Sequence, residues 1–212
     1  MAKLFSYVIM FDAGAAPNPF WGYCSLTICK PVIRRTASVG DWILGFGATR
    51  VEVKGKGYKS YSGYLVYAMK VSEVLSLREY NEFCLSHLPD KVPVWKTNDW
   101  RKRLGDCVYR FSGDDIIQRK SVHGQQHIDT DLSGLNALLS NNFYYFGNKA
   151  MPIPNSLGKI THKGRGHKIT NDSKQISEFE SWIKKFKKNK LYGEPQYRHK
   201  YDLDFGSNDS AC

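Results

Sequence analysis

The sequence predicts an α+β fold, a single domain with a bent mixed or antiparallel sheet or a small β-barrel and about three helices. Short apolar runs bounded by turn residues recur along the chain, as is typical of strands. Apolar residues with helical spacing are confined to a few segments. No stretch of linker composition divides the 212 residues, a length that suffices for one large core.

The expected strands follow one another from the N-terminus. Residues 4–11 and 23–29 are the first two, and the nearly all-apolar run 41–46 is expected to be buried on both faces. The basic, glycine-containing stretch 52–61 indicates an exposed loop or hairpin, and residues 63–73 give the strongest strand pattern. Two further strands are expected at 105–111 and 142–147.

Three helices are expected. Ser76 and Glu79 form a capping box before a helix at 77–85. Asp131 is expected to cap a second helix at 131–139. The third begins after Asp172 and carries one apolar stripe, formed by Ile176, Phe179, Ile183 and Phe186. Residues 1–192 are expected to form the domain, and the polar residues 193–212 a loosely ordered tail.

The composition points to a polyanionic partner. A formal net charge of +11 attracts nucleic acid, a nucleotide or an anionic membrane surface, although a merely basic soluble protein remains the alternative. No run of 18 apolar residues is present, so no membrane association is expected. Five cysteines without Cys-x-x-Cys spacing favour a reducing, cytoplasmic location, and neither a metal nor another cofactor is expected.

The stretch 17–47 combines aromatic side chains, glycine and arginine. Such a combination suits a nucleobase, which stacks on rings, and its phosphate, which pairs with guanidinium groups. The alternative is that the rings are sheet core. The predicted stacking residues are Phe20, Trp21, Tyr23 and Trp42, the predicted phosphate contacts here are Arg34 and Arg35, and the predicted readers of base edges are Asp12 and Asn18.

A second candidate site is the basic, glycine-containing loop 164–168, which precedes the expected third helix. Glycine allows close approach of the backbone, and a helix start binds anions. The loop lacks the end of a Walker motif, so the alternative is a solvated basic turn. Its predicted phosphate-binding residues are Gly164, Arg165, Gly166, His167 and Lys168.

Evidence for catalysis is sparse in the sequence. His123 and His127 are four residues apart, but Gly124 and the absence of an HExxH pattern argue against a helical zinc site. No Gly-x-Ser-x-Gly motif and no obvious nucleophile–base pair is present. If the chain is an enzyme, His123 or His167 is the candidate general base, because histidine titrates near neutrality.

Several of these segments together resemble the nucleotide modification associated domain 2 family, over most of the chain up to the last helix. The most specific are APNPFWGYC at 16–24 and GRGHK at 164–168. The others are Ser6–Val8 with Asp12, Lys30-Pro31, 39–43, 65–71, Gly105-Asp106, the His123 loop and 142–147. The resemblance implies an association with modified bases in DNA, in phage or bacteria, but supplies no reaction. The element order is also similar to PUA-like folds of the ASCH, EVE and YTH groups, which implies a small β-barrel with a base-binding cleft.

The sequence therefore predicts a binding module that recognises a modified base, in nucleic acid (DNA rather than RNA) or in a nucleotide. The alternatives are an enzyme acting on a nucleotide or on a base in DNA, with a histidine general base, and a scaffold that binds a partner protein through its aromatics. We further expect residues 20–23 and 164–168 to border one cleft, because together they would hold a nucleotide at both ends.

Overall fold

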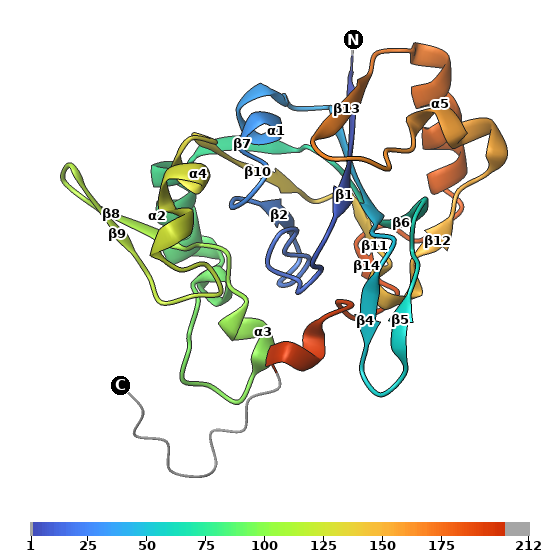
Figure 1. Cartoon of the computed structure of the whole chain (residues 1–212). Helices are drawn as coiled ribbons and strands as arrows, with labels where there is room; N and C mark the ends of the chain where they lie inside the picture. The colour runs from blue at the N-terminus through green and yellow to red at the C-terminus, as the bar shows by residue number, and fades with distance from the viewer. Residues whose placement is uncertain (1, 202–212) are drawn as a thin grey trace.

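The computed structural model describes residues 2–201 as an α+β protein around a seven-stranded mixed sheet (Figure 1). The sheet has the order β13-β1-β3-β6-β11-β14, with β12 also paired to β6. Its strands are β1 (Leu4–Ile9), β3 (Trp42–Gly47), β6 (Tyr64–Lys70), β11 (Phe143–Tyr145), β12 (Met151–Pro152), β13 (His167–Thr170) and β14 (Lys190–Leu191). β1 runs parallel to β3 and antiparallel to β13. The sheet ends at β13 and β14, so the predicted bent mixed sheet is present, and within residues 2–201 it does not close into a barrel.

A second, three-stranded antiparallel sheet and two hairpins complete the β structure. The second sheet has the order β2-β10-β7, with β2 (Cys24–Leu26), β10 (Asn136–Ser140) and β7 (Glu73–Ser76). The hairpins are β4 (Val51–Val53) with β5 (Gly57–Lys59), and β8 (Tyr109–Ser112) with β9 (Asp115–Gln118). The first hairpin confirms the prediction made for residues 52–61.

The helices are short except for two. The α-helices are α1 (Pro31–Thr36), α2 (Leu77–His87), α3 (Trp100–Arg103), α4 (Ile128–Leu132) and α5 (Ser173–Ile183). The 3₁₀ turns are η1 (Pro89–Lys91), η2 (Gln125–His127), η3 (Gly147–Lys149), η4 (Asn155–Ile160) and η5 (Arg198–Tyr201). No helix of residues 2–201 combines the length and the apolar character that crossing a membrane needs.

The main sheet is buried on both faces. One face packs against β2 and β10 through a core that includes Phe5, Tyr67 and Leu138. The other face packs against α5, which covers it in Figure 1 and contributes the predicted stripe of Ile176, Phe179 and Ile183. All six residues of β3 are buried, as the apolar run predicted.

Two helix predictions are confirmed and one is wrong. Ser76 and Glu79 form the expected capping box of α2, and Asp172 accepts hydrogen bonds at the start of α5. The helix expected at 131–139 is absent, because α4 ends at Leu132 and β10 begins at Asn136. β10 lies between β2 and β7 and is buried from its second residue to its last, so its sequence lacks the alternation that identifies a half-exposed strand.

Residues 193–201 are packed into the domain, which corrects the expectation for the first part of the tail. The backbone N–H of Tyr197 donates to the carbonyl of Asp12 at 2.9 Å, and the side chains of Gln196 and Tyr197 are buried. The polar composition of this segment concealed these contacts. The remainder of the expected tail, residues 202–212, lies outside the described residues.

Gly45 gives a test of the packing between β1, β3 and β6. A Cβ atom there would overlap the side chains of Ile9 and Tyr67, which are held in the core. We expect Gly45→Ala to lower the free energy of unfolding by about 1–3 kcal/mol, as overpacking does. Chemical denaturation measures this free energy. Gly158→Ala is the control, because a Cβ at Gly158 meets nothing within 4 Å. Equal stability of the two variants would contradict the tight packing.

Candidate functional site

The predicted general base His123 belongs to a hydrogen-bonded cluster with Cys29 and Asp131. Its Nδ1 lies 2.7 Å from Asp131 Oδ2, and its Nε2 lies 3.5 Å from Cys29 Sγ. The other carboxylate oxygen, Oδ1, accepts the backbone N–H of Cys29 at 2.8 Å. Tyr109 completes the group by donating its hydroxyl to Asp131 Oδ2 at 3.0 Å. The carboxylate, the imidazole and the thiol thus form a chain of contacts with the imidazole in the middle.

Arg34, a buried residue of α1, holds the backbone around this cluster in place. Its guanidinium donates to the carbonyls of Cys29 and Asn136, both at 2.8 Å, and to that of Asp131. The side chain is fully buried, and burial lowers its pKa to about 10, against the opposing effect of the Asp131 carboxylate. Because its donors are occupied inside the protein, we do not include Arg34 among the phosphate contacts. Arg35 is exposed and donates to Ser133 O at 3.0 Å.

The surroundings stabilise the protonated form of His123. Burial alone would lower its pKa, but the hydrogen bonds with Asp131 and Cys29 and their negative charges outweigh it and raise the pKa to about 9. For Asp131, burial would raise the pKa, but the bonds from His123, the Cys29 backbone and Tyr109 lower it. At neutral pH the pair is therefore an imidazolium beside a carboxylate.

The same cluster offers three donor atoms within 4.8 Å of one another, a spacing that suits a metal ion. The donors are, however, bonded to each other: the 2.7 Å contact between His123 and Asp131 needs a proton between Nδ1 and Oδ2. A metal ion at this position would have to displace that proton. The geometry is that of a proton relay toward Cys29 Sγ.

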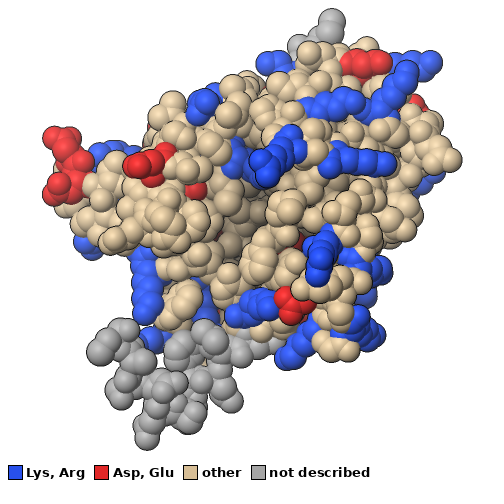
Figure 2. Space-filling model, in the orientation of Figure 1, with Lys and Arg blue, Asp and Glu red and all other residues tan. Residues whose placement is uncertain are grey.

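A cleft of about 350 Å³ lies beside β13, and we call it the β13 cleft. It contains the glycines of the predicted loop together with three cationic side chains, Lys30, Lys163 and Arg165. Its remaining lining residues are Val8, Met10, Gly47, Ala48, Thr49 and Ser62, so no carboxylate of residues 2–201 lines it. In Figure 2 the surface is hollowed beside the β13 region, and blue side chains gather over that region.

The cations of the β13 cleft are not neutralised within residues 2–201. None of Lys30, Lys163 and Arg165 takes part in an ion pair there. Lys30 is partly buried, with its Nζ 4.6 Å from the ring centre of Tyr7, and burial lowers its pKa while the charge of Cys29 opposes that shift. An anionic group entering the cleft would meet three cationic side chains that have no acidic partner in the described chain.

The loop differs in one respect from its prediction. It leads into strand β13, so no helix start lies behind it, and the argument from helix N–H groups does not apply. Gly164 and Arg165 are exposed, whereas His167 is half-buried beside Phe5, at 6.0 Å between ring centres. Burial and the positive charges of His162 and Lys30 lower the pKa of His167. Lys168 bonds back to the carbonyl of Lys159.

The predicted stacking residues are dispersed. Phe20 packs edge-on against Trp100, at 5.4 Å between ring centres, and lines a cleft of about 480 Å³ beside α3. Trp21 lies under the guanidinium of Arg101, at 5.0 Å. Tyr23 packs against Phe83 of α2. Trp42 is buried under α5 and donates its Nε1–H to Glu180 at 2.9 Å.

The prediction that residues 20–23 and 164–168 share one cleft is therefore wrong. Phe20 lines the cleft beside α3, whereas the glycine-basic loop lines the β13 cleft. Figure 1 shows β13 and α3 toward opposite ends of the molecule. The aromatic segment is tied to α2 and α3, elements 60 and 80 residues further along the chain, by contacts that no local pattern reveals.

The two predicted readers of base edges are also buried. Asp12 accepts the Tyr145 hydroxyl at 2.6 Å and the Gln196 backbone N–H at 3.2 Å, and burial raises its pKa to about 6 against these bonds. Asn18 donates to Leu104 O at 2.8 Å and accepts from Lys91 Nζ at 2.8 Å. Both side chains are occupied inside the protein, so we leave them out of the binding surface.

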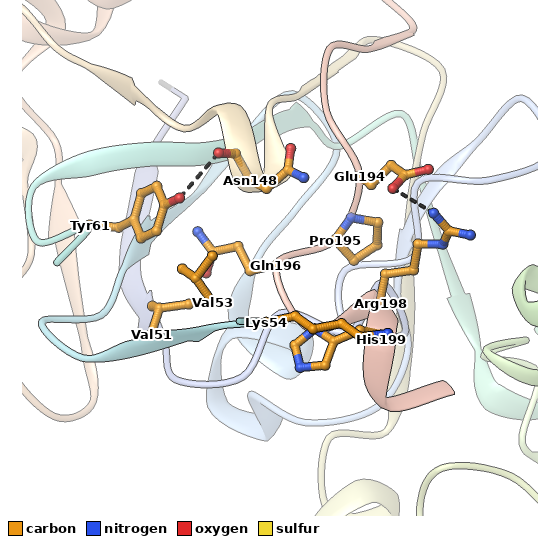
Figure 3. A pocket seen from close by; sticks show the side chains of 10 residues that line it. All are labelled: Val51, Val53, Lys54, Tyr61, Asn148, Glu194, Pro195, Gln196, Arg198 and His199. Atoms are coloured by element: carbon orange, nitrogen blue, oxygen red, sulfur yellow. Dashed lines mark hydrogen bonds and ion pairs between the residues drawn. The ribbon is translucent and has the colours of Figure 1, made fainter. Parts of the chain in front are cut away.

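A third cleft of about 270 Å³ lies between the β4–β5 hairpin and the segment that ends in η5 (Figure 3). Tyr61 bonds to Asn148 O at 3.2 Å on one side, and Arg198 pairs with Glu194 at 2.8 Å on the other. None of the residues that the sequence predicted lines this cleft. Its lining includes the basic side chains Lys54 and Arg198 but also the carboxylate of Glu194, which pairs with Arg198, so it offers less to an anion than the β13 cleft does.

Sequence reasoning missed Cys29, Lys30, Asp131 and Lys163 as functional candidates. Cys29 stands 94 residues from His123 and 102 from Asp131, so no spacing rule connects them. Lys30 and Lys163 line the same cleft because the sheet places β1 between β3 and β13. A local signal did exist for Lys163, which directly precedes the glycine-basic loop.

Comparison with known protein families identifies a match over almost the whole chain. A family model described as nucleotide modification associated domain 2 matches residues 1–202. No curated protein and no solved structure shows significant similarity to the chain.

Proposed function

Since the chain belongs to the nucleotide modification associated domain 2 family, we propose that it recognises a modified base, in DNA or in a nucleotide, and holds the attached phosphate in the β13 cleft. The observation that carries this proposal is the set of three cations, Lys30, Lys163 and Arg165, which have no carboxylate partner among residues 2–201, around a cleft that no carboxylate of those residues lines. Phosphate oxygens are the natural partners of such a group.

The glycines of the loop support a ligand in this cleft. A Cβ at Gly164 would meet only His162, at 3.8 Å, which is an ordinary contact, so packing within the protein does not require glycine there. Gly166 adopts a φ of +78°, which favours glycine, and a Cβ there would point into open space. A backbone without side chains at both positions allows a phosphate to approach its N–H groups.

Removing the two exposed cations should weaken nucleic-acid binding without abolishing the fold. For Lys163→Ala and Arg165→Ala we expect weaker binding to every oligonucleotide, and the slope of log K against log salt should fall by about 1 for each phosphate that the variant no longer neutralises. Fluorescence anisotropy with single-stranded and duplex oligonucleotides at several salt concentrations measures this. Lys187→Ala and Lys188→Ala, exposed lysines after α5, are the matched controls.

Base recognition is tested separately, with oligonucleotides and mononucleotides that carry plain or modified bases. A preference for one modification that persists at high salt supports recognition of the base, because the phosphate contribution is then screened. Equal, fully salt-sensitive binding to all polyanions would reduce the proposal to a basic surface.

An enzyme acting on a nucleotide or on a base in DNA is the second candidate. The observation that favours it is the bond of 2.7 Å between His123 and Asp131, which holds the imidazole in a fixed orientation. Incubation with a nucleotide panel and analysis by mass spectrometry tests it, and unchanged masses throughout would count against this candidate.

A further inference from the structure

We infer that Cys29 is the nucleophile of an acyl-transfer site, in which His123 transfers the proton and Asp131 orients His123. The substrate class is a nucleotide or nucleobase that carries an amide or ester group. The nucleotide part of this statement rests on the proposed function, whereas the reactivity of Cys29 stands on the cluster itself.

The order of the contacts is the one that nucleophilic catalysis needs. Asp131 bonds to Nδ1 of His123, which leaves Nε2 facing Cys29 Sγ at 3.5 Å. This arrangement of nucleophile, base and orienting group is recognised by its geometry and occurs on unrelated folds. Asp131 also accepts the backbone N–H of Cys29, so one buried carboxylate fixes both partners.

The backbone at Cys29 is held in an unusual conformation. Cys29 and Lys30 have φ angles of 59° and 44°, two successive non-glycine residues in the left-handed region. Such a turn persists where the surroundings determine it, and here Asp131 holds the Cys29 N–H while Arg34 holds its carbonyl. The turn directs the thiol away from β2 toward His123.

Cys29 is the accessible cysteine of the described chain. Cys24, Cys84 and Cys107 are buried, whereas Cys29 is partly exposed and its partner His123 has 14% of its side chain exposed. Lys30, the next residue, lines the β13 cleft. A substrate whose phosphate occupies that cleft lies next to the turn that carries the thiol.

The electrostatics agree with the geometry. His123 has a pKa of about 9, so its imidazole is protonated at neutral pH, and its Nε2 lies 3.5 Å from the partly exposed Cys29 Sγ. Cys29 therefore resembles the reactive cysteines of acyl-transfer enzymes more than an inert core thiol.

The proposed reaction is a hydrolysis, in which water is the only co-substrate. The Cys29 thiolate attacks the carbonyl carbon, a C–S bond forms, and the π electrons move to oxygen. When they return, the C–N or C–O bond breaks, and the leaving amine or alcohol takes the proton of His123 Nε2. Water, deprotonated by His123, then attacks the thioester and releases a carboxylic acid and the thiolate.

Acylation of the protein tests the nucleophile directly. With p-nitrophenyl acetate as probe, we expect a burst of p-nitrophenol and an acetyl group on Cys29, located by peptide mass spectrometry. Cys29→Ser should lose the adduct, and His123→Gln should slow its formation by about 10²- to 10⁴-fold. His127→Gln is the matched control, because His127 packs on His123 at 4.5 Å between ring centres but does not contact Sγ.

Asp131 is a positioning residue, and the pH profile of acylation identifies its role. In Asp131→Asn the alkaline limit of the rate should move to lower pH, since His123 loses the carboxylate that supports its charge. A loss of rate with an unchanged profile would indicate a structural effect alone. Circular dichroism of each variant confirms that it is folded.

Three results would overturn the inference: acetylation of Cys29 no faster than that of the unfolded chain, an equal rate in His123→Gln, or stoichiometric zinc that protects Cys29 from the probe. Oligonucleotide binding by the same variants separates this inference from the proposed function. Retained acylation with no nucleotide binding would contradict the proposed function only.

Discussion

Replacing Lys91 with alanine is expected to lower the free energy of unfolding by about 3–5 kcal/mol, because it breaks a buried charged network. Lys91 is fully buried and its Nζ donates to Asn18 Oδ1 and Ser25 Oγ, both at 2.8 Å. The carbonyls of Asn18 and Tyr23 lie 2.9 and 3.0 Å from Nζ, so its three N–H groups are shared among four acceptors. Without Lys91 these buried acceptors lose their charged donor, and the oxygens of Asn18 keep the weaker backbone N–H groups of Ser25 and Phe20 as partners.

The buried carboxylate of Asp106 increases the expected loss. It accepts the hydroxyls of Ser25 at 2.6 Å and of Tyr80 at 2.8 Å, and its charge supports the protonated form of Lys91. Burial lowers the pKa of Lys91, and the Asp106 carboxylate opposes that shift. Removing the cation therefore leaves a carboxylate in the interior without its counter-charge.

Urea denaturation of the variant measures the loss, with Lys102→Ala as the matched control. Lys102 is partly exposed and pairs with Asp90 at 2.9 Å near the surface, so its removal should cost less than about 1 kcal/mol. If the two lysine variants had equal stability, the network would not hold the segment between Asn18 and Ser25.

This network explains why the sequence alone misassigns the same residues. Asn18, in the turn Pro-Asn-Pro, has the pattern of a reader of base edges, whereas it binds Lys91 and Leu104 inside the protein. Asp106 has the pattern of a turn cap, whereas it accepts hydroxyls from β2 and α2. Polar residues near a turn are ambiguous, because a buried partner from a distant segment is invisible in the sequence.

The local elements, by contrast, are well predicted. The capping box before α2, the cap and apolar stripe of α5, and the buried run of β3 each depend on residues a few positions apart. The failures involve distant partners. The segment expected to be a helix at 131–139 contains most of β10, because pairing with β2 and β7 decides its conformation.

The candidate site also has a part that the local sequence predicts and a part that depends on distant partners. The glycine-basic loop is identifiable from its composition and does line a cleft. The cluster of Cys29, His123 and Asp131 is identifiable only through His123, because its members come from segments about a hundred residues apart. Only the fold brings the turn after β2 against the segment that leads into α4.

The protonated state of His123 should make stability fall as the pH rises from about 6.5 to about 9. Histidine in the unfolded chain has a pKa of 6.5, and in the folded protein His123 has a pKa of about 9. Between these values the folded state binds one more proton than the unfolded state, so the stabilisation is complete below 6.5 and is lost through 9. The difference between the two pKa values corresponds to a stabilisation of the folded state by about 3 kcal/mol.

The groups that face His123 are the carboxylate of Asp131, the thiol of Cys29 and the ring of His127. The lowered pKa of Asp131 keeps its titration in the acid range, outside this window. Urea denaturation of wild type and His123→Gln at pH 6 to 9.5 measures the contribution of His123 with its contacting partners, since groups remote from His123 cancel in the difference. The difference in the free energy of unfolding between wild type and His123→Gln should decrease by about 3 kcal/mol as the pH rises. A difference independent of pH would mean that His123 is neutral in the folded protein.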